Sequence, residues 1–130
     1  IAPDEILVEI SIPPMAPRTG YAFEQVSRRK GDFALVGVAT TVTIGKNDLI
    51  EDAKISIIGV GETPIMANNA CKAIIGKAPL SENIELAAQI ASQNDIDPPS
   101  DLHATSSYRK HLAKILVNQT IVKAVERTKN

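Results

Sequence analysis

Aromatic side chains are the scarcest class in this sequence. Tryptophan does not occur, and tyrosine and phenylalanine together make up 3% of the 130 residues, whereas 44% of the chain is hydrophobic. A chain of this length is about one domain and buries roughly two thirds of its surface on folding. Ile, Val, Leu and Ala must therefore build one core, and few aromatic rings are left to stack on nucleic-acid bases.

An excess of charge of one sign is also missing. Fourteen Lys and Arg residues face fifteen Asp and Glu residues, which gives a formal net charge of -1. Proteins that bind nucleic acid through its phosphates normally carry a clear basic excess, so no nucleic-acid partner is expected.

Cysteine and histidine are too few for a disulfide framework or a zinc site. Cys71 is the single cysteine, and His103 and His111 lie eight residues apart without partners at zinc-ligand spacing. We expect a buried thiol at Cys71, no metal, and a reducing, cytoplasmic setting.

Long hydrophobic runs and a cationic leader are absent as well. The longest apolar run, residues 33–39, is far short of the roughly 18 residues that a membrane span needs. The chain opens with Ile1 instead of Met, and we expect it to be one domain, residues 1–130, cut from a longer protein.

The first half of the chain has the pattern of β-strands. In residues 5–13, apolar side chains alternate with a period of two, which predicts a strand with one buried face. The run 33–44 is β-branched and only partly alternating, as in a central strand covered on both faces. A turn is expected at 45–48, and further strands at 20–27 and 51–61 complete a mostly antiparallel sheet of about four strands.

The second half changes to helical periodicity. Helices are expected over residues 66–75, over 81–94 with Ser81 as the capping residue, and from about Ser106, where Tyr108, Leu112, Ile115, Leu116 and Val122 form an apolar stripe. The proline-rich segment 95–101 separates the last two. Strands followed by three helices predict an α+β sandwich, with the helices packed on the sheet.

The segment "GVGETP", residues 59–64, resembles a dinucleotide-binding loop only in part. Its third glycine is missing and the sheet is not built from βαβ units. We therefore interpret it as a strand-to-helix turn in which Pro64 fixes the first helical residue.

A cluster of cations precedes the predicted central strand. Arg28, Arg29 and Lys30 are followed by Gly31 and Asp32 in the segment "VSRRKGDFALVG". Adjacent cations repel one another and are usually spread into solvent, so spacing alone leaves two alternatives: a solvated loop, or an anion or cofactor site.

Four segments in this order resemble one known family, namely the C-terminal domain of the FAD-binding medium subunit of carbon monoxide dehydrogenase and the related molybdenum hydroxylases of the xanthine dehydrogenase group. The segments are "PDEILVEISIP", "FEQVSRRKGDFALVGVA", "GVGETPIMANNA" and "YRKHLAKILV". The resemblance spans nearly the whole chain, and "SRRKGDFA" is its most specific part.

The resemblance implies an oxidoreductase role in electron transfer. In that family a molybdenum-cofactor large subunit oxidises the substrate, an iron–sulfur small subunit relays electrons, and the FAD of the medium subunit passes them to an acceptor. Upstream domains of the medium subunit bind the FAD in that family, so this fragment alone is expected to hold no cofactor and to be inactive. The alternative is a free-standing α+β interaction module without a redox role.

The resemblance also implies a set of cofactor-binding residues. Leu7 corresponds to a residue that touches FAD, whereas Glu24 stands where xanthine-oxidising relatives have a lysine, which favours the carbon monoxide dehydrogenase branch. The loop from Arg28 to Phe33 would lie near the isoalloxazine ring, with Arg28, Arg29 and Lys30 favouring flavin reduction and Asp32 opposing it. The alternative for this loop is a structural contact that pins the domain against a neighbouring domain.

Overall fold

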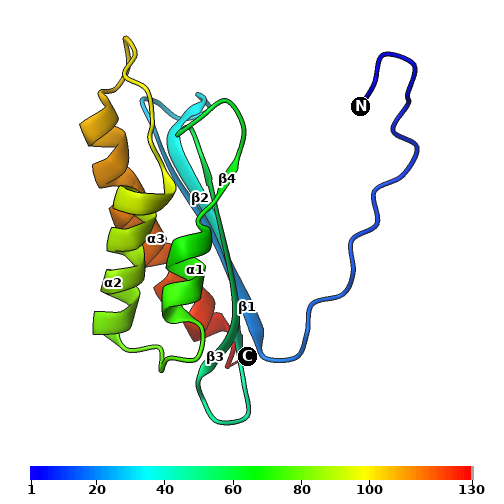
Figure 1. The fold of residues 1–130 in the computed structure, drawn as a ribbon, viewed down its shortest axis with the longest axis vertical. Coiled ribbons are helices and arrows are strands. Elements are labelled where there is room, and N and C mark those ends of the chain that lie inside the picture. The colour runs from blue at the N-terminus through cyan, green and yellow to red at the C-terminus, as the bar shows by residue number, and fades with distance from the viewer. Residues whose placement is uncertain (130) are drawn as a thin grey trace.

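An antiparallel sheet forms one layer of the molecule, as the sequence predicts. The computed structural model describes residues 1–129 (Figure 1). Its four strands are adjacent in chain order, β1-β2-β3-β4, and every neighbouring pair is antiparallel. The strands are β1 (Thr19–Ser27), β2 (Ala34–Ile44), β3 (Ile50–Ile58) and the short β4 (Ile65–Met66).

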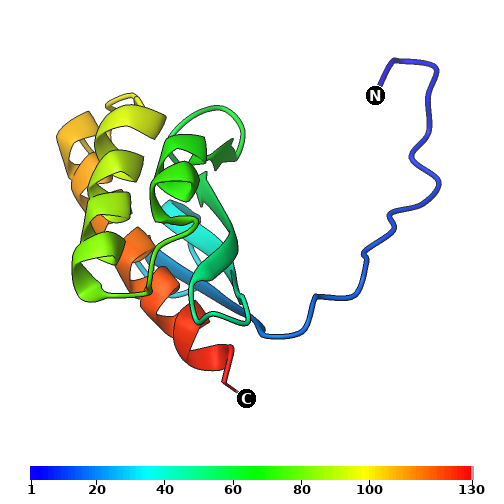
Figure 2. The ribbon, with the colours of Figure 1, turned by 60° about the horizontal axis from the view of Figure 1, so that its bottom comes forward.

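Three helices form the second layer and lie on one face of the sheet (Figure 2). They are α1 (Asn68–Ile74), α2 (Ser81–Ile90), which continues into a π-helical turn, η1 (Ala91–Asp95), and the long α3 (Ser106–Arg127). The predicted α+β architecture is therefore confirmed, with α3 the longest helix and with the loop at 28–33 and the turn at 45–48 at opposite ends of β2.

The core lies between the sheet and the helices. Val36, Val38 and Val42 of β2 are fully buried against this layer, because alternate residues of a strand point to the same face. Ala39, which points to the opposite face, is exposed. The expectation that β2 is covered on both faces is therefore wrong, because the helices cover only one.

The predicted strand at residues 5–13 does not form. This segment has no strand assignment, and it leaves the sheet at the start of β1 as an extended chain (Figure 1). Strand pairing needs a partner edge for its backbone hydrogen bonds, and a period of two in the sequence does not supply that edge. The fourth strand is instead the two-residue β4.

One predicted helix start and one predicted cap are also wrong. Pro64 precedes β4 and is not helical, and Ser81 is the first residue of α2 but makes no capping hydrogen bond. At α1 the free backbone N–H groups of Asn69 and Ala70 donate instead to the carboxylate of Asp95, at 3.0 and 2.9 Å. The cap thus comes from a residue 26 and 25 positions away from these two donors, which local sequence patterns could not predict.

The buried stripe of α3 is rotated from the predicted one. Tyr108, Ile115 and Val122 are exposed, whereas Leu112 and Leu116 are buried as expected. The stripe includes two polar positions that the prediction left out, Arg109 and Thr120, because both find partners in the sheet. The buried residues of α3 are Arg109, Leu112, Ala113, Leu116, Val117, Thr120, Ile121 and Ala124.

Candidate functional site

The charged loop, residues 28–33, is a compact turn organised by Asp32. The backbone N–H of Asp32 donates to the carbonyl oxygen of Arg29 at 3.1 Å, and Gly31 has a φ of 83°, a conformation that suits glycine. One carboxylate oxygen of Asp32 accepts the N–H of Phe33 at 2.9 Å, and the other accepts Nη2 of Arg28 at 3.2 Å. The loop therefore has a defined shape despite its three adjacent cations.

The charged loop still presents most of its charge to solvent. The side chain of Arg29 is 79% exposed, and its Nε makes only a long contact, 3.6 Å, with the Asp32 carboxylate. Lys30 is also exposed. Phe33 is 94% exposed. An exposed phenyl ring beside three cations is an unusual surface for a solvated loop and suits contact with a flat, anionic group.

Arg109 lies next to the charged loop and is hydrogen-bonded to the ends of β2 and β3. Its side chain is 8% exposed. Nη1 donates to the carbonyl oxygens of Leu35 and Gly59, at 2.5 and 2.8 Å, and Nη2 donates to the carboxylate of Asp101 at 2.6 Å. We call Arg109 with these three partners the Arg109 anchor; only Nε of Arg109 is left buried without an acceptor among residues 1–129.

Asp101 is held in its charged form. Its Oδ1 accepts the backbone N–H groups of His103 and Ala104, at 2.8 and 2.9 Å, while Oδ2 accepts from Arg109. The hydrogen bonds from the backbone of His103 and Ala104 are the main cause that lowers the pKa of Asp101 below its ordinary value; burial opposes them, and the charge of Arg109 adds a smaller lowering effect. The anchor is therefore an ion pair at neutral pH.

The charged loop and the Arg109 anchor border the same cleft, which we call the Arg109 cleft. It has a volume of about 350 Å³. Two cations and two carboxylates face it, and their charges are already paired within the protein. The cleft can therefore position the loop, and its lining adds only one more ionisable side chain, the imidazole of His103, without a second acid, base or nucleophile grouped beside it. Its lining includes Arg28, Asp32, Phe33, Gly59, Asp101 and Arg109.

The structure brings together only part of the predicted site. Arg28, Arg29, Lys30, Asp32 and Phe33 form the charged loop, as their proximity in sequence requires.

Glu24 and Leu7 lie outside the charged loop. Glu24 points to the helical side of β1 and forms an ion pair with Lys123 of α3. Leu7 is 60% exposed in the extended N-terminal segment. Neither residue lines the Arg109 cleft.

Sequence reasoning missed the Arg109 anchor. Its one local signal is that Arg109 precedes Leu112 and Leu116 by three and seven residues, so the arginine shares their buried face. The glycines of "GVGETP" have a structural role here: Gly59 has a φ of 78°, and a Cβ at this position would lie 2.3 Å from the carbonyl oxygen of Leu35. The segment is a turn, as predicted, but it joins β3 to β4 instead of a strand to a helix.

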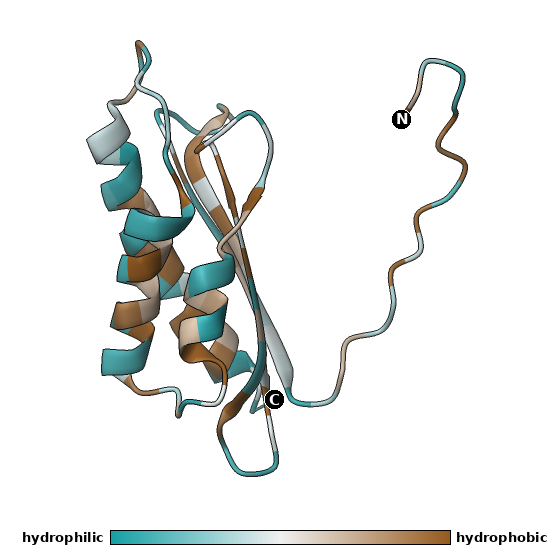
Figure 3. Cartoon of the chain, viewed as in Figure 1, coloured by the Kyte–Doolittle hydropathy of each residue, from teal (hydrophilic) through white to brown (hydrophobic). Residues whose placement is uncertain are grey.

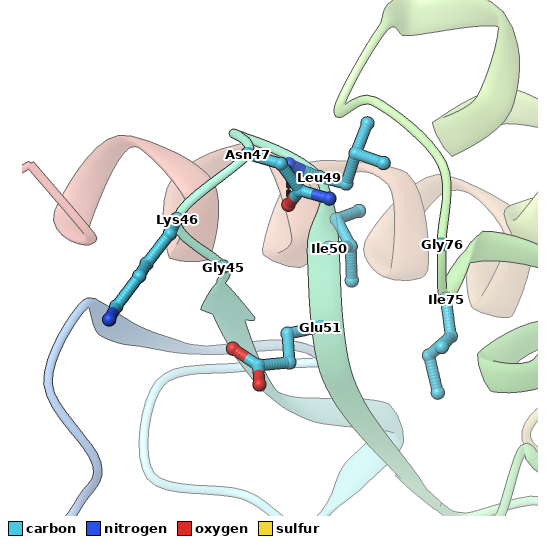
Figure 4. A pocket seen from close by; sticks show the side chains of 8 residues that line it. All are labelled: Gly45, Lys46, Asn47, Leu49, Ile50, Glu51, Ile75 and Gly76. Carbon is cyan, nitrogen blue, oxygen red and sulfur yellow. Dashed lines mark hydrogen bonds between the residues drawn. The ribbon is translucent and has the colours of Figure 1, made fainter.

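A hollow larger than the Arg109 cleft lies at the other end of the sheet. It has a volume of about 590 Å³ and is lined by the β2–β3 turn and by Ile75 and Gly76. Figure 4 shows that Lys46 and Asn47 extend in different directions from the turn instead of converging. Size alone would favour this hollow, but it contains no grouped functional side chains and none of the predicted site residues.

Other chemistry finds no support among residues 1–129. No group of three or more potential ligands there could hold a metal ion. Cys71 is buried as predicted, and burial raises the pKa of its thiol, which makes it a poor nucleophile. None of the helices in this range combines the length and the apolar character that crossing a bilayer requires.

Comparison with known proteins connects this geometry to one family. The family model described as the CO dehydrogenase flavoprotein C-terminal domain matches residues 21–124. The 6-hydroxypseudooxynicotine dehydrogenase complex subunit alpha of Paenarthrobacter nicotinovorans is 33% identical over 129 residues, which are 99% of this chain and 43% of that protein. The carbon monoxide dehydrogenase medium chain of Afipia carboxidovorans is 31% identical, with 100% of this chain and 44% of that protein covered.

Solved structures agree with the sequence matches. Carbon monoxide dehydrogenase from Hydrogenophaga pseudoflava superposes with a TM-score of 0.82 at 28% identity, over 89% of this chain and 40% of that chain. Quinoline 2-oxidoreductase from Pseudomonas putida 86 gives a TM-score of 0.79 at 29% identity, over 88% and 39%. The chain thus spans less than half the length of these relatives, which are subunits of multi-subunit oxidoreductases, and it belongs to the CO dehydrogenase flavoprotein C-terminal domain family.

Proposed function

We propose that this chain is the flavin-facing C-terminal part of the medium subunit of a cytoplasmic molybdenum hydroxylase of the carbon monoxide dehydrogenase type. Its partners would be FAD-binding domains of the same subunit, a molybdenum-cofactor large subunit and an iron–sulfur small subunit. The FAD, when bound, accepts electrons from the iron–sulfur clusters and passes them to an acceptor. The domain would cover one side of the flavin, with the charged loop beside the isoalloxazine ring.

The observation that carries this proposal is the charged loop itself. Three cations and an exposed phenyl ring are grouped on a turn whose shape is fixed by Asp32 and which borders the same cleft as the Arg109 anchor. A preformed loop can hold charges at a constant distance from a neighbouring ring, which is what tuning a redox potential requires. Family membership supplies the flavin that such a loop would face.

The loop residues fit a flavin in two ways. Phe33 can pack its ring against another flat ring, and the guanidinium and ammonium groups can stabilise the negative charge that a reduced flavin gains. Asp32 partly offsets those cations, since it pairs with Arg28 and Arg29.

Contacts of Leu7 and Glu24 with FAD stay predictions. Leu7 would need the N-terminal segment to reach the flavin, and Glu24 already has Lys123 as its partner.

A redox titration of the FAD in the purified complex tests this function. Arg29→Gln and Arg28→Gln should each lower the flavin potential by roughly 20–50 mV, because each removes a positive charge that favours reduction. Asp32→Asn should raise the potential, because it removes the opposing negative charge.

Lys46→Gln is the matched control, since Lys46 is an exposed cation at the opposite end of β2. The proposal predicts no shift for this variant. Potentials that move no more in the two arginine variants than in Lys46→Gln would reject a flavin beside the charged loop.

A further inference from the structure

We infer that residues 5–12 form a β-strand that adds to the open edge of a second sheet, located in the part of the subunit that the relatives have beyond the region matched here. This inference concerns how the domain is joined to its neighbour. It goes beyond the proposed function, and it does not depend on where the flavin lies.

The first argument is the apolar face of this segment. Every second residue is a β-branched aliphatic side chain, the pattern of a strand with one face on a core. Figure 3 shows the alternation of hydrophobic and hydrophilic residues along the extended N-terminal chain. The four side chains of this face, Ile6, Val8, Ile10 and Ile12, are 85, 91, 72 and 87% exposed. Four neighbouring aliphatic side chains left in water mark a surface that another surface covers.

The second argument is the backbone. Within residues 1–129, the backbone groups of residues 6–12 form no hydrogen bond, and the side-chain bond in this stretch, from Ser11 to Glu9, is local. Pro3 precedes the segment, and Pro13 and Pro14 follow it. Proline lacks the N–H that a sheet ladder uses, so these residues limit a strand to about the length of residues 4–12.

The sheet of this domain is a poor partner for the segment. Its edge strands are β1 and the two-residue β4. On β1 the carbonyl oxygen of Tyr21 already accepts Nη1 of Arg127 at 2.6 Å, and the Arg127 guanidinium lies over the Tyr21 ring. A side chain that occupies an edge acceptor in this way protects the edge from further pairing.

The comparisons point to the occupant. The family match begins at residue 21, so residues 5–12 lie outside the domain that the family model describes. More than half of each medium-chain relative lies outside the region that this chain covers. An added strand gives affinity through its backbone and specificity through its alternate side chains. The partner edge therefore borders an apolar core that takes Ile6, Val8 and Ile10, while Leu7 and Glu9 point to the opposite face.

Hydrogen exchange of the purified full-length subunit tests this inference. Amides of residues 6–12 should exchange at least about 100-fold more slowly in the natural subunit than in residues 1–130 alone, as expected for paired strands. Fast exchange in both proteins would overturn the inference. Slow exchange in residues 1–130 alone would also overturn it, because the segment would then pair with its own sheet or with a second copy.

A pair of variants tests which face is buried. Val8→Asp places a charge on the apolar face, and Ser11→Asp places the same charge on the opposite face. In the full-length subunit, Val8→Asp should remove most of the added protection, whereas Ser11→Asp should keep it. Equal loss in both variants, or in neither, would contradict the assigned face. The exchange rates are independent of the flavin potential, so this inference and the proposed function can fail separately.

Discussion

The Arg109 anchor and the charged loop hold arginines in two contrasting environments. The Arg109 side chain is 8% exposed and has three oxygen acceptors within 2.8 Å, whereas that of Arg29 is 79% exposed and 3.6 Å from its one carboxylate. Arg109 is therefore a fixed part of the fold, and Arg29 keeps its donors available for a ligand. The two guanidinium groups have opposite roles because burial has removed the water around Arg109, whereas Arg29 is still hydrated.

The largest effect is expected from removing the anchor. Arg109→Met should lower the free energy of unfolding by about 3–5 kcal/mol, because it leaves the carbonyl oxygens of Leu35 and Gly59 and the carboxylate of Asp101 without their donor. Urea denaturation of residues 1–130 measures this. Arg109→Lys should lose less, about 1–3 kcal/mol, because an ammonium keeps the charge but not the planar fork. Wild-type stability for Arg109→Met would show that the anchor is not a structural element.

Two glycines extend the contrast between the anchor and the charged loop. Gly59 and Gly31 both have a positive φ, but a Cβ at Gly59 would lie 2.3 Å from the carbonyl oxygen of Leu35, whereas a Cβ at Gly31 would meet nothing within 4 Å. Gly31→Ala should therefore lower the free energy of unfolding by about 1 kcal/mol, from backbone conformation alone. Gly59→Ala should lower it by about 3 kcal/mol or more, because the backbone must also move. Equal losses in the two variants would mean that the turn next to the anchor can relax freely.

A smaller effect is expected from pH, and it concerns Asp101. Its pKa is lowered in the folded state, mainly by the backbone hydrogen bonds from His103 and Ala104, so these interactions of the charged carboxylate stabilise the protein fully above the ordinary value of 3.8. That contribution is lost as the pH falls through the lowered folded-state pKa. In Asp101→Asn the urea midpoint should depend less on pH between 5 and 2 than in the wild type. Asp97→Asn is the matched control, since the Asp97 carboxylate is 94% exposed and, among residues 1–129, pairs only with Lys110. The same pH dependence in both variants would contradict the role of Asp101.

The elements that local sequence patterns predict correctly are those whose partners are also local or repetitive. β1 and β2 follow from their β-branched and aromatic residues, α3 follows from the helical spacing of its apolar residues, and the charged loop follows from three cations beside a glycine. The Arg109 anchor could not be predicted in this way, because its acceptors at Leu35 and Gly59 lie 74 and 50 residues away in sequence. An arginine on an apolar helix face signals a buried partner but does not identify it.

The strand prediction for residues 5–13 is wrong for a different reason, which is the lack of a partner edge in this domain. Its pattern is as clear as that of β1, yet it forms no strand here. Periodicity reports which face of a strand would be buried, whereas the presence of an edge to pair with is a property of the surrounding fold. A strand pattern without a strand is therefore informative about what lies next to the domain.

The smallest effect on stability is expected in the charged loop. Arg29→Gln should change the free energy of unfolding by less than about 0.5 kcal/mol, because an exposed ion pair is screened by water and its partner Asp32 also pairs with Arg28. Urea denaturation checks this, with Arg109→Lys as the comparison. If Arg29→Gln loses almost no stability but shifts the flavin potential in the complex, Arg29 acts on the flavin and Arg109 on the fold. A loss as large as that of Arg109→Lys would instead make Arg29 a structural residue, and a potential shift in that variant could then come from a displaced loop.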